Sequence, residues 1–263
     1  MDNLKILIVE GNLKEENQNF KKVGIPTHTE SLKESLNFLS KDLSLEVVNP
    51  SSDKNIDMVI EKLENYDGLI WGGSSLNIYN ISNEIKKQIE FMKECLKKVK
   101  NILAICWGMQ VAVTAAGGEV KKAKESQIGI AEEIEINETG SSSPLYFKKE
   151  CKFNSPAFNF DEVVKLPKEA LCLSSNQKNK IQSLYFKTNN ANVWGLQYHP
   201  EISYEKMINL IEFRKEKLIK KRKVFKDEND MQKHINLINN EILNSNKNQR
   251  MLELENWINI IKT

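Results

Sequence analysis

Short apolar runs alternate with amphipathic stretches through the first hundred residues of the chain. The runs are continuous, as in strands that are buried on both faces of a sheet. They predict strands at residues 4–9, 45–48, 67–71 and 101–105. Between them, apolar residues recur at helical spacing and predict helices at residues 31–41, 56–63 and 85–99, the first opened by a capping box from Ser31 to Glu34.

Strands separated by helices of this length indicate βαβ units. The expected fold class is therefore α/β, a flavodoxin-like, doubly wound and mostly parallel sheet with helices on both faces. In such a sheet, the ligand site lies at the carboxyl ends of the strands.

From about Gly118 the runs become shorter and partly alternating, which is typical of antiparallel strands. We therefore expect a small antiparallel sheet beside the main one. The predicted strands lie at residues 128–136, 161–166, 170–173 and 181–186, and a last apolar strand lies at residues 193–198.

After Ser203 the chain is predicted to be helical. The expected division is an enzymatic domain over residues 1–210 and a helical C-terminal extension over residues 211–263. Its apolar positions lead us to expect that the extension packs on the same domain, as a roof over the ligand site. Residues 214–223 are basic, but acidic residues and apolar spacing accompany them, which favours a solvated helix face over a polyanion site.

Composition narrows the function further. The chain has 38 basic and 36 acidic residues, so no global field favours nucleic acid or a membrane surface. No apolar run approaches the roughly 20 residues that span a bilayer, and no signal-peptide pattern opens the sequence. The four cysteines lack metal-site spacing. We expect reduced thiols, a cytoplasmic location, no metal and no cofactor.

One of these cysteines, Cys106, stands between the strand at 101–105 and an apolar helical stretch. A sharp strand-to-helix turn presents a nucleophile at the sheet edge and needs small neighbours, here Ala104 and Gly108. The helix N-terminus favours the reactive thiolate. The alternative is a buried cysteine that acts as a small hydrophobic residue.

A second candidate element follows the strand at 193–198. That strand ends at His199, and Glu201 follows two residues later. The histidine is suited to act as general base and acid, with the carboxylate orienting its ring. His28 and His234 lack comparable surroundings and are interpreted as structural.

The third element is the Gly72-Gly73 turn after the strand at 67–71. Its backbone N–H groups can face a developing oxyanion, with the N–H of Trp107 as a second donor. Taken alone, such a turn usually only reverses the chain. The combination of three elements at the carboxyl ends of predicted parallel strands is what indicates a catalytic site.

At these residues the sequence resembles the triad-type class I glutamine amidotransferases. Cys106, Gly108 and Gln110 match the family's Gly-x-Cys-x-Gly-x-Gln elbow, and residues 199–201 match its His-Pro-Glu. Residues 161–167 resemble its Asp-x-Val-x-x-Leu-Pro stretch. The resemblance covers residues 4–210 and is strongest to stand-alone domains similar to the amidotransferase part of GMP synthase. Three departures bear mainly on substrate identity: Ala104 replaces a Gly, Asn159 replaces a His, and Phe160 replaces a small residue.

The resemblance implies that Cys106, His199 and Glu201 form a catalytic triad. Cys106 would attack the side-chain amide of glutamine or another γ-glutamyl compound, ammonia or an amine would leave, and water would hydrolyse the glutamyl thioester. Backbone groups near Gly73 and Trp107 would hold the oxyanion, and Gln110 would help to seat the substrate.

Two uses of this chemistry are expected. The first is supply of ammonia to a separate synthetase, because the chain has neither a Gly-x-x-x-x-Gly-Lys-Ser/Thr loop nor a Ser-Gly-Gly-x-Asp-Ser loop for a nucleotide. The alternative is a self-sufficient γ-glutamyl hydrolase or peptidase that acts on a small conjugate. A non-enzymatic binding module is disfavoured, since all three triad residues are present.

Overall fold

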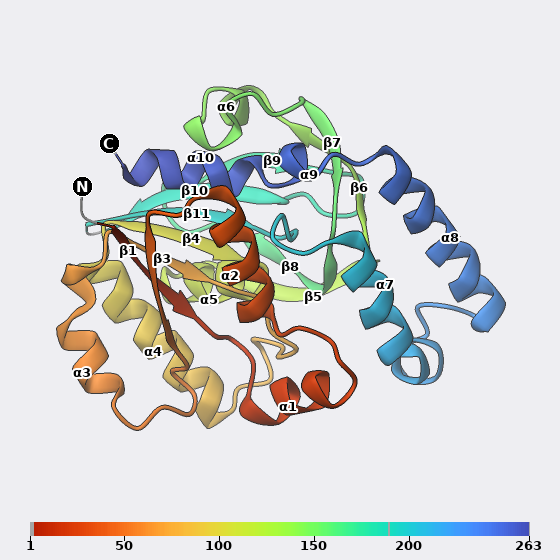
Figure 1. Cartoon of the computed structure of the whole chain (residues 1–263), viewed down its shortest axis with the longest axis horizontal. Helices are drawn as coiled ribbons and strands as arrows, with labels where there is room; N and C mark the ends of the chain where they lie inside the picture. Colours follow the sequence, from red (N-terminus) through yellow and green to blue (C-terminus); the bar gives the residue numbers. More distant parts are fainter. Residues whose placement is uncertain (1–2, 189, 263) are drawn as a thin grey trace.

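The computed structural model describes residues 3–188 and 190–262. Within them, nine strands form one sheet in the order β2-β1-β3-β4-β11-β10-β9-β6-β7, and β5 pairs with β8 separately (Figure 1). The strands are β1 (Leu4–Val9), β2 (Leu43–Val48), β3 (Gly68–Trp71), β4 (Asn101–Ile105), β5 (Glu119–Ile128), β6 (Ala131–Ile136), β7 (Lys152–Ser155), β8 (Phe158–Lys165), β9 (Leu171–Ser175), β10 (Ser183–Thr188) and β11 (Ala191–Leu196).

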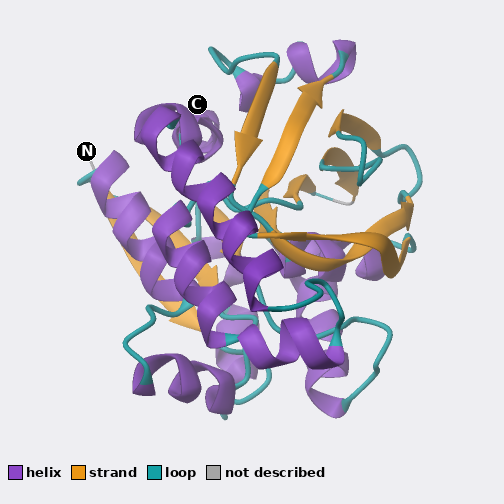
Figure 2. Cartoon of the chain, turned by 90° about the vertical axis from the view of Figure 1, so that its right-hand side faces the viewer, coloured by secondary structure: helices purple, strands orange, loops and turns teal. Residues whose placement is uncertain are grey.

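The main sheet has a parallel half and an antiparallel half, which meet at β11. Strands β2, β1, β3, β4 and β11 are parallel to their neighbours in that order, whereas β10 runs antiparallel to β11 and begins the second half. The carboxyl ends of β3, β4 and β11 therefore lie side by side. In Figure 2 the antiparallel strands extend beyond the part of the molecule that the helices cover.

Helices cover both faces of the parallel half. Because successive side chains of a strand point to opposite faces, Leu7 and Val9 of β1 pack in one apolar cluster and Ile6 and Ile8 pack in another. The helices are α1 (Lys14–Lys22), α2 (His28–Leu39), α3 (Ile56–Glu61), α4 (Asn83–Lys98), α5 (Trp107–Ala115), α6 (Glu138–Ser141), α7 (Tyr204–Phe213), α8 (Glu228–Asn244), α9 (Lys247–Arg250) and α10 (Leu252–Ile261). Single turns are η1 (Leu63–Asn65), η2 (Pro144–Tyr146) and the π-helical η3 (Lys217–Lys221).

The two clusters show which face of the sheet each helix covers. Apolar side chains of α4 and α5 form the first cluster with the sheet, and those of α2 and α10 form the second. Helices α2 and α10, the last helix, therefore share one face of the sheet, although the two are far apart in sequence (Figure 1). The final helix is thus part of the core of the fold.

Particular contacts fix α10 in place. Trp257 is fully buried and packs on Gly68, where a Cβ would lie 2.6 Å from the indole ring. Glu253 is also fully buried, and it accepts hydrogen bonds from Lys149 (3.0 Å) and from the Tyr198 hydroxyl (2.7 Å). A buried carboxylate is tolerated only when it is paired in this way.

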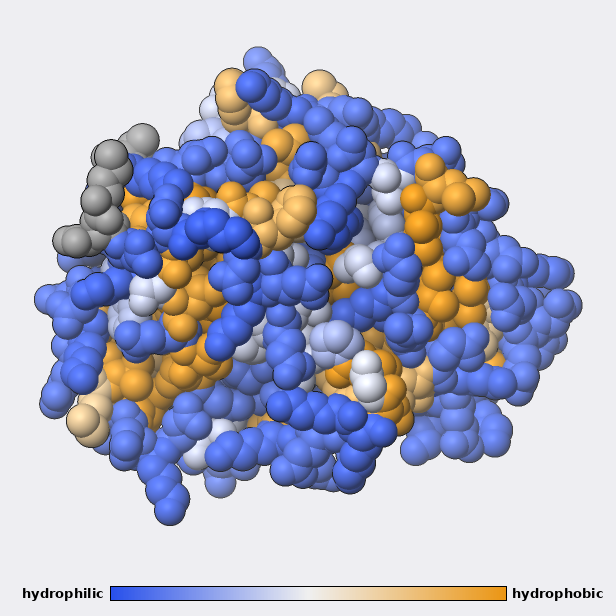
Figure 3. All heavy atoms as spheres, in the orientation of Figure 1, coloured by the Kyte–Doolittle hydropathy of each residue, from blue (hydrophilic) through white to orange (hydrophobic). Residues whose placement is uncertain are grey.

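The other end of the extension packs elsewhere. Helices α7 and α8 and the η3 turn close a third apolar cluster with β5 and β8, centred on Ile128, Ile211 and Ile238. The remaining surface is mostly hydrophilic, with apolar atoms visible between polar side chains (Figure 3). None of the helices described has the length and apolar character needed to cross a bilayer.

The predicted fold class is confirmed, with two local differences. The capping box is formed by Thr27 and Glu30, so α2 begins at His28 and Ser31 lies inside the helix, contrary to the prediction. Two consecutive Ser/Thr-x-x-Glu patterns occur in this stretch, and the earlier one adds a turn after Pro26. Most of the strands predicted as a separate antiparallel sheet instead extend the main sheet, and only β5 and β8 stand apart.

Candidate active site

Cys106 occupies a sharp turn between β4 and α5. Its backbone lies at φ 53° and ψ −101°, a conformation that is rare for a residue with a side chain and is found mainly at functional sites. Its N–H donates to the carbonyl of Leu196 in β11 (2.6 Å). At Gly108, two residues on, a methyl group would overlap the carbonyl oxygen of Trp71, so this turn requires a glycine.

His199 and Glu201 follow β11, the strand beside β4. The His199 N–H donates to the Pro156 carbonyl (2.7 Å), and Nδ1 of the ring lies 2.7 Å from Oε1 of Glu201. Both side chains are almost completely buried. Neighbouring strands therefore bring Cys106, His199 and Glu201 together at one edge of the sheet.

The backbone around Glu201 is held from two directions. Its carbonyl accepts a hydrogen bond from the Ser35 hydroxyl of α2 (2.9 Å). The carbonyls of Pro200 and Ile202 accept from the guanidinium of Arg250, at 2.5 and 2.6 Å. The C-terminal extension thus fixes the loop that carries the carboxylate.

The surroundings of the His199 ring favour its charged form. Burial lowers the pKa of His199, but the Glu201 carboxylate and the Cys106 thiolate outweigh it and raise this pKa to about 10. The ring therefore carries a proton at neutral pH. A thiolate beside an imidazolium is the attacking form of a catalytic cysteine.

The Gly72-Gly73 turn closes over the same histidine. A Cβ on Gly73 would lie 2.8 Å from Cε1 of His199, whereas a Cβ on Gly72 would have no atom nearer than 3.9 Å. The Gly72 carbonyl accepts from the Gly108 N–H (3.2 Å), which ties this turn to the elbow. Trp107 is the first residue of α5, so its N–H has no partner within the helix.

Two glutamines lie beside the sulfur. Gln110, on the first turn of α5, is buried and lies 3.5 Å from Gln197 through their side-chain amides. Nε2 of Gln197 in turn lies 3.5 Å from Sγ of Cys106. Gln197 was not singled out from the sequence, where only its place two residues before His199 could have drawn attention to it.

A small cavity lies next to Cys106. Its volume is about 30 Å³, which is room for about one water molecule and too little for glutamine. The lining comes from the elbow, from the stretch after the Gly-Gly turn, from β8 and from the extension: Cys106, Trp107, Gln110, Ser74, Ser75, Leu76, Asn77, Phe158, Asn159, Phe160, Asp161, Arg214, Lys217 and Arg222. All three positions that depart from the family pattern are therefore near the site, two of them in the cavity wall and Ala104 on the strand below it.

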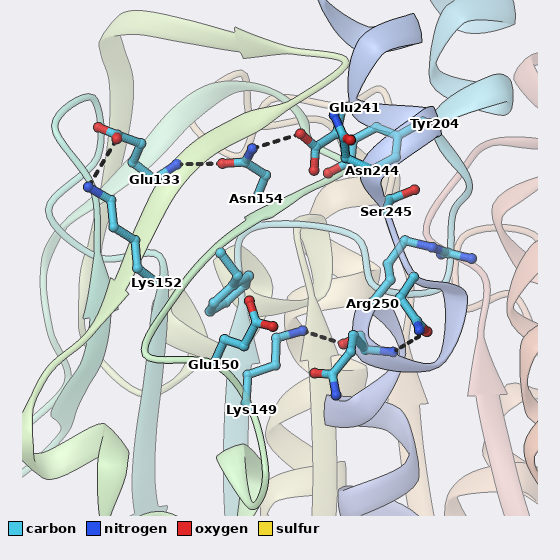
Figure 4. Close-up of a pocket in the computed structure, with 13 residues that line it drawn as sticks. Glu133, Lys149, Glu150, Lys152, Asn154, Tyr204, Glu241, Asn244, Ser245 and Arg250 are labelled. Carbon is cyan, nitrogen blue, oxygen red and sulfur yellow. Dashed lines mark hydrogen bonds and ion pairs between the residues drawn. The ribbon is translucent and has the colours of Figure 1, made fainter.

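A larger hollow lies outside the site, between β6–β7 and the start of the α9 segment (Figure 4). It measures about 380 Å³ and is lined by Lys149, Tyr204, Glu241 and Arg250 among others. Its lining contains no cysteine and no histidine. The smaller cavity is the one that Cys106 lines.

The structure places His28 in the site, contrary to its interpretation from the sequence. The His28 ring stacks on that of His199, with centroids 5.5 Å apart, and also faces Gly73. Burial and the nearby Lys206 hold the pKa of His28 well below its usual value, so the ring is neutral. Its position at the first turn of α2, far from any strand end, gave no sequence signal. His234 does pack as expected, against Phe225 and the Ile128 carbonyl.

Lys206 is a further buried group behind the site. Its Nζ donates to the Thr27 carbonyl (3.1 Å) and to the Ser31 hydroxyl (2.6 Å). Burial lowers the pKa of Lys206 to about 8, although the carboxylates of Glu201 and Glu10 oppose this shift. Lys206 therefore contributes positive charge next to the Glu201 loop.

Among the described residues, one group has the composition of a metal site: His28, His199 and Glu201, whose ligand atoms lie within 4.8 Å of one another. The two rings are stacked at an interplanar angle of 21°, and Nδ1 of His199 already contacts Glu201. Lone pairs of stacked imidazoles lie in parallel planes and do not converge. The arrangement suits proton transfer better than metal binding.

Comparison with known proteins shows the family of the chain. The sequence profile of the family "Glutamine amidotransferase class-I" matches residues 27–216. The chain is 31% identical over 207 residues to a γ-glutamyl-L-1-hydroxyisopropylamide hydrolase of Pseudomonas sp., covering 77% of this chain and 69% of the relative. It is 30% identical over 166 residues to a glutamine-hydrolysing GMP synthase subunit of Sulfolobus acidocaldarius, covering 62% of this chain and 80% of the relative.

The fold has solved counterparts as well. A glutamine amidotransferase from Thermotoga maritima matches with a TM-score of 0.68 and 19% identity over 99% of both chains, a likeness that concerns the fold. The chain belongs to the class I glutamine amidotransferase family. It is accordingly an enzyme of the amidohydrolase kind that this family comprises.

Proposed function

We propose that the chain hydrolyses the side-chain amide of γ-glutamyl compounds, with Cys106 as nucleophile, His199 as general acid and base, and Glu201 as the group that orients the ring. The observation that carries this proposal is the buried row of sulfur, imidazole and carboxylate at the ends of β4 and β11. Each of these groups is held by backbone hydrogen bonds, which is the preorganisation that catalysis needs.

In the first half-reaction, the Cys106 thiolate attacks the amide carbon and forms a C–S bond. The carbonyl oxygen takes up negative charge, which backbone N–H groups at Gly73 and Trp107 stabilise. The His199 imidazolium donates its proton to the amide nitrogen as the C–N bond breaks, and ammonia or an amine leaves.

In the second half-reaction, the now neutral His199 removes a proton from water. The hydroxide attacks the thioester carbon, the C–S bond breaks, and the thiolate is regenerated beside the protonated ring. Glutamate is the second product. Glu201 stabilises the charged ring in both halves, and Gln110 lies where it can help to seat the substrate.

The released nitrogen has two possible destinations. We favour a self-contained hydrolase of a γ-glutamyl amide, because the chain's own extension walls the pocket and because one relative is a hydrolase of such an amide. The second candidate is delivery of ammonia to a separate synthetase, which the similarity to the GMP synthase relative favours. In both cases the substrate is a small molecule.

An ammonia- and amine-release screen of the purified chain tests the proposal. The substrates are glutamine, γ-glutamyl methylamide and a γ-glutamyl dipeptide, with asparagine as the short-chain control. Turnover of γ-glutamyl amides by the chain alone supports the self-contained hydrolase. Turnover that appears only when a nucleotide-dependent synthetase is added supports ammonia delivery, and no turnover in either setting contradicts the proposal.

The four cysteines are free thiols, which suits the cytoplasmic location that we infer.

The division into an enzymatic domain (1–210) and a helical extension (211–263) stays a prediction. The burial of α10 in the core suggests that the two parts fold together.

A further inference from the structure

Three cations of one short segment line the cavity beside Cys106. Arg214 follows α7, and Lys217 and Arg222 begin and follow the η3 turn. This is the basic run for which the sequence favoured a solvated helix face. The other lysines of the turn do face solvent: Lys220, for example, is mostly exposed and pairs with Glu216 at 3.0 Å. We call Arg214, Lys217 and Arg222 the cationic roof.

Arg214 is committed to contacts within the protein. Its guanidinium pairs with Glu16 (2.6 Å), donates to the Ser75 hydroxyl (2.5 Å) and lies between the rings of Phe20 and Phe158. Burial lowers the pKa of Arg214 despite the Glu16 carboxylate, as expected for a cation held inside the protein. This residue anchors the roof to the domain.

The other two cations lack such a partner. Arg222 lies over the Phe160 ring at 4.6 Å and makes one long hydrogen bond, 3.4 Å, to the Asn77 side chain. Within the described part of the chain, neither Lys217 nor Arg222 has an ion-pair partner. Burial and the two neighbouring arginines lower the pKa of Lys217, so unpaired positive charge gathers here.

The acidic groups at or near the cavity offset only part of this charge. Glu16 is taken by Arg214. Asp161 accepts hydrogen bonds from Asn77 (2.5 Å) and from the Tyr79 hydroxyl (2.7 Å), and burial raises its pKa. Three cations thus stand against two carboxylates, one of which pairs with Arg214, so positive charge is in excess. Partly buried positive charge of this kind is stabilised by an anionic ligand.

We propose that Lys217 and Arg222 bind a carboxylate of the γ-glutamyl substrate, either its α-carboxylate or one on the leaving group. This inference rests on the proposed function. A γ-glutamyl group carries its own α-carboxylate, and a conjugate with an amino acid carries a second one on the leaving group. Because the cavity holds only about 30 Å³, some of its lining side chains must move when a substrate enters. The substrate carboxylate then replaces the weak contacts of Arg222 with Phe160 and Asn77.

The test compares variants across substrates that differ in the carboxylates they carry and in their leaving groups. Arg222→Gln and Lys217→Gln remove one charge each, Arg222→Lys keeps the charge without the planar fork, and Lys220→Gln is the matched exposed control. The substrates are glutamine, glutamine α-amide, γ-glutamyl methylamide and γ-glutamylglycine. Circular dichroism and thermal melting show whether each variant is folded.

If the roof binds the α-carboxylate, Arg222→Gln raises KM about 10- to 100-fold for glutamine and γ-glutamyl methylamide, with kcat nearly unchanged. The effect is then much smaller on the α-amide, and Arg222→Lys restores part of the affinity. If the roof binds a leaving-group carboxylate, the loss is confined to γ-glutamylglycine. An equal loss on all four substrates, or none, overturns the proposal.

A binding measurement separates this inference from the proposed function. In a Cys106→Ala background, calorimetric titration with γ-glutamylglycine and with glutamine α-amide measures affinity without turnover. The inference predicts about 10-fold or more weaker binding of the acidic ligand when Arg222→Gln is added, and little change for the amide. Equal affinity with and without Arg222 contradicts it, whether or not the wild-type chain shows turnover.

Discussion

The floor and the roof of the pocket are built in different ways. The floor consists of Cys106, which lines the pocket, and of His199 and Glu201 next to it. All three are buried and are held by hydrogen bonds of their main chains at the ends of β4 and β11. The cationic roof reaches the pocket through long side chains of a single turn, and only Arg214 has an ion-pair partner among the described residues. Because the backbone holds the floor residues in place, we expect them to carry out the same reaction on every substrate. The roof consists of side chains, so single substitutions there can change which substrate is preferred.

This contrast predicts that floor variants lose turnover on every substrate, while roof variants lose discrimination between substrates.

The largest expected effect is that of Cys106→Ala. Removing a nucleophile from a catalytic triad typically costs about 10⁶-fold in kcat. We expect no measurable release of ammonia or amine and an unchanged far-ultraviolet circular dichroism spectrum. Residual turnover at more than a thousandth of the wild-type rate would place the nucleophile elsewhere.

Glu201→Gln tests whether the Glu201 carboxylate orients the His199 ring and stabilises its charged form. We expect a loss of about 10²- to 10⁴-fold in kcat, since the ring loses its orienting carboxylate. Because Glu201 helps to raise the pKa of His199 to about 10, its removal lowers that pKa. The imidazolium then loses its proton at lower pH.

The pH profile of kcat/KM shows whether the pKa of His199 falls in this variant. In the wild type, the alkaline limb falls near pH 10, as the pKa of His199 requires, and in Glu201→Gln the limb shifts toward neutral pH. An alkaline limb that stays in place in the variant would show that Glu201 does not act on the ring.

Gly73→Ala probes the loop that closes the floor. A Cβ there would lie 2.8 Å from Cε1 of His199, so the loop or the ring must move. Losing an oxyanion donor typically costs about 10²- to 10³-fold in kcat, and we expect a loss of that order. Gly72→Ala adds a Cβ with no atom nearer than 3.9 Å and should cost much less. Similar losses for both variants would argue against a specific role for Gly73.

Trp257→Ala has the smallest expected effect on kcat, because Trp257 belongs to α10, the part of the extension that packs in the core of the fold. Trp257 is fully buried against Gly68, so the substitution should lower the free energy of unfolding by about 3–5 kcal/mol. Urea denaturation measures this change. At temperatures where the variant is folded, its kcat should stay within a few-fold of wild type. A stable variant without turnover would mean that α10 acts on the site directly.

The sequence predicted the floor because its residues follow strand ends. In a parallel sheet, neighbouring strands place their carboxyl ends at one edge, so Cys106 and His199 had to approach each other once β4 and β11 were adjacent. The Gly72-Gly73 turn was found in the same way. The roles of these residues remain to be tested, but their proximity was predictable.

The residues that the sequence did not reveal reach the site by packing between elements. His28 sits on the first turn of a helix and meets His199 only because α2 lies on that face of the sheet. The roof cations lie in a run whose composition resembles a solvated helix face. Only the π-helical η3 turn directs Lys217 and Arg222 toward the cavity while Lys220 faces solvent. The spacing of hydrophobic residues in the sequence does not predict which of these cations face the cavity.

The formation of a covalent intermediate on Cys106 is the most direct test of the central claim. The chain is mixed with a γ-glutamyl methylamide substrate, quenched in acid within one turnover, and examined by intact and peptide mass spectrometry. We predict a mass gain of one γ-glutamyl group, located on the peptide that contains Cys106. Steady-state turnover with no adduct, or an adduct on Cys95, Cys151 or Cys172, would contradict the account.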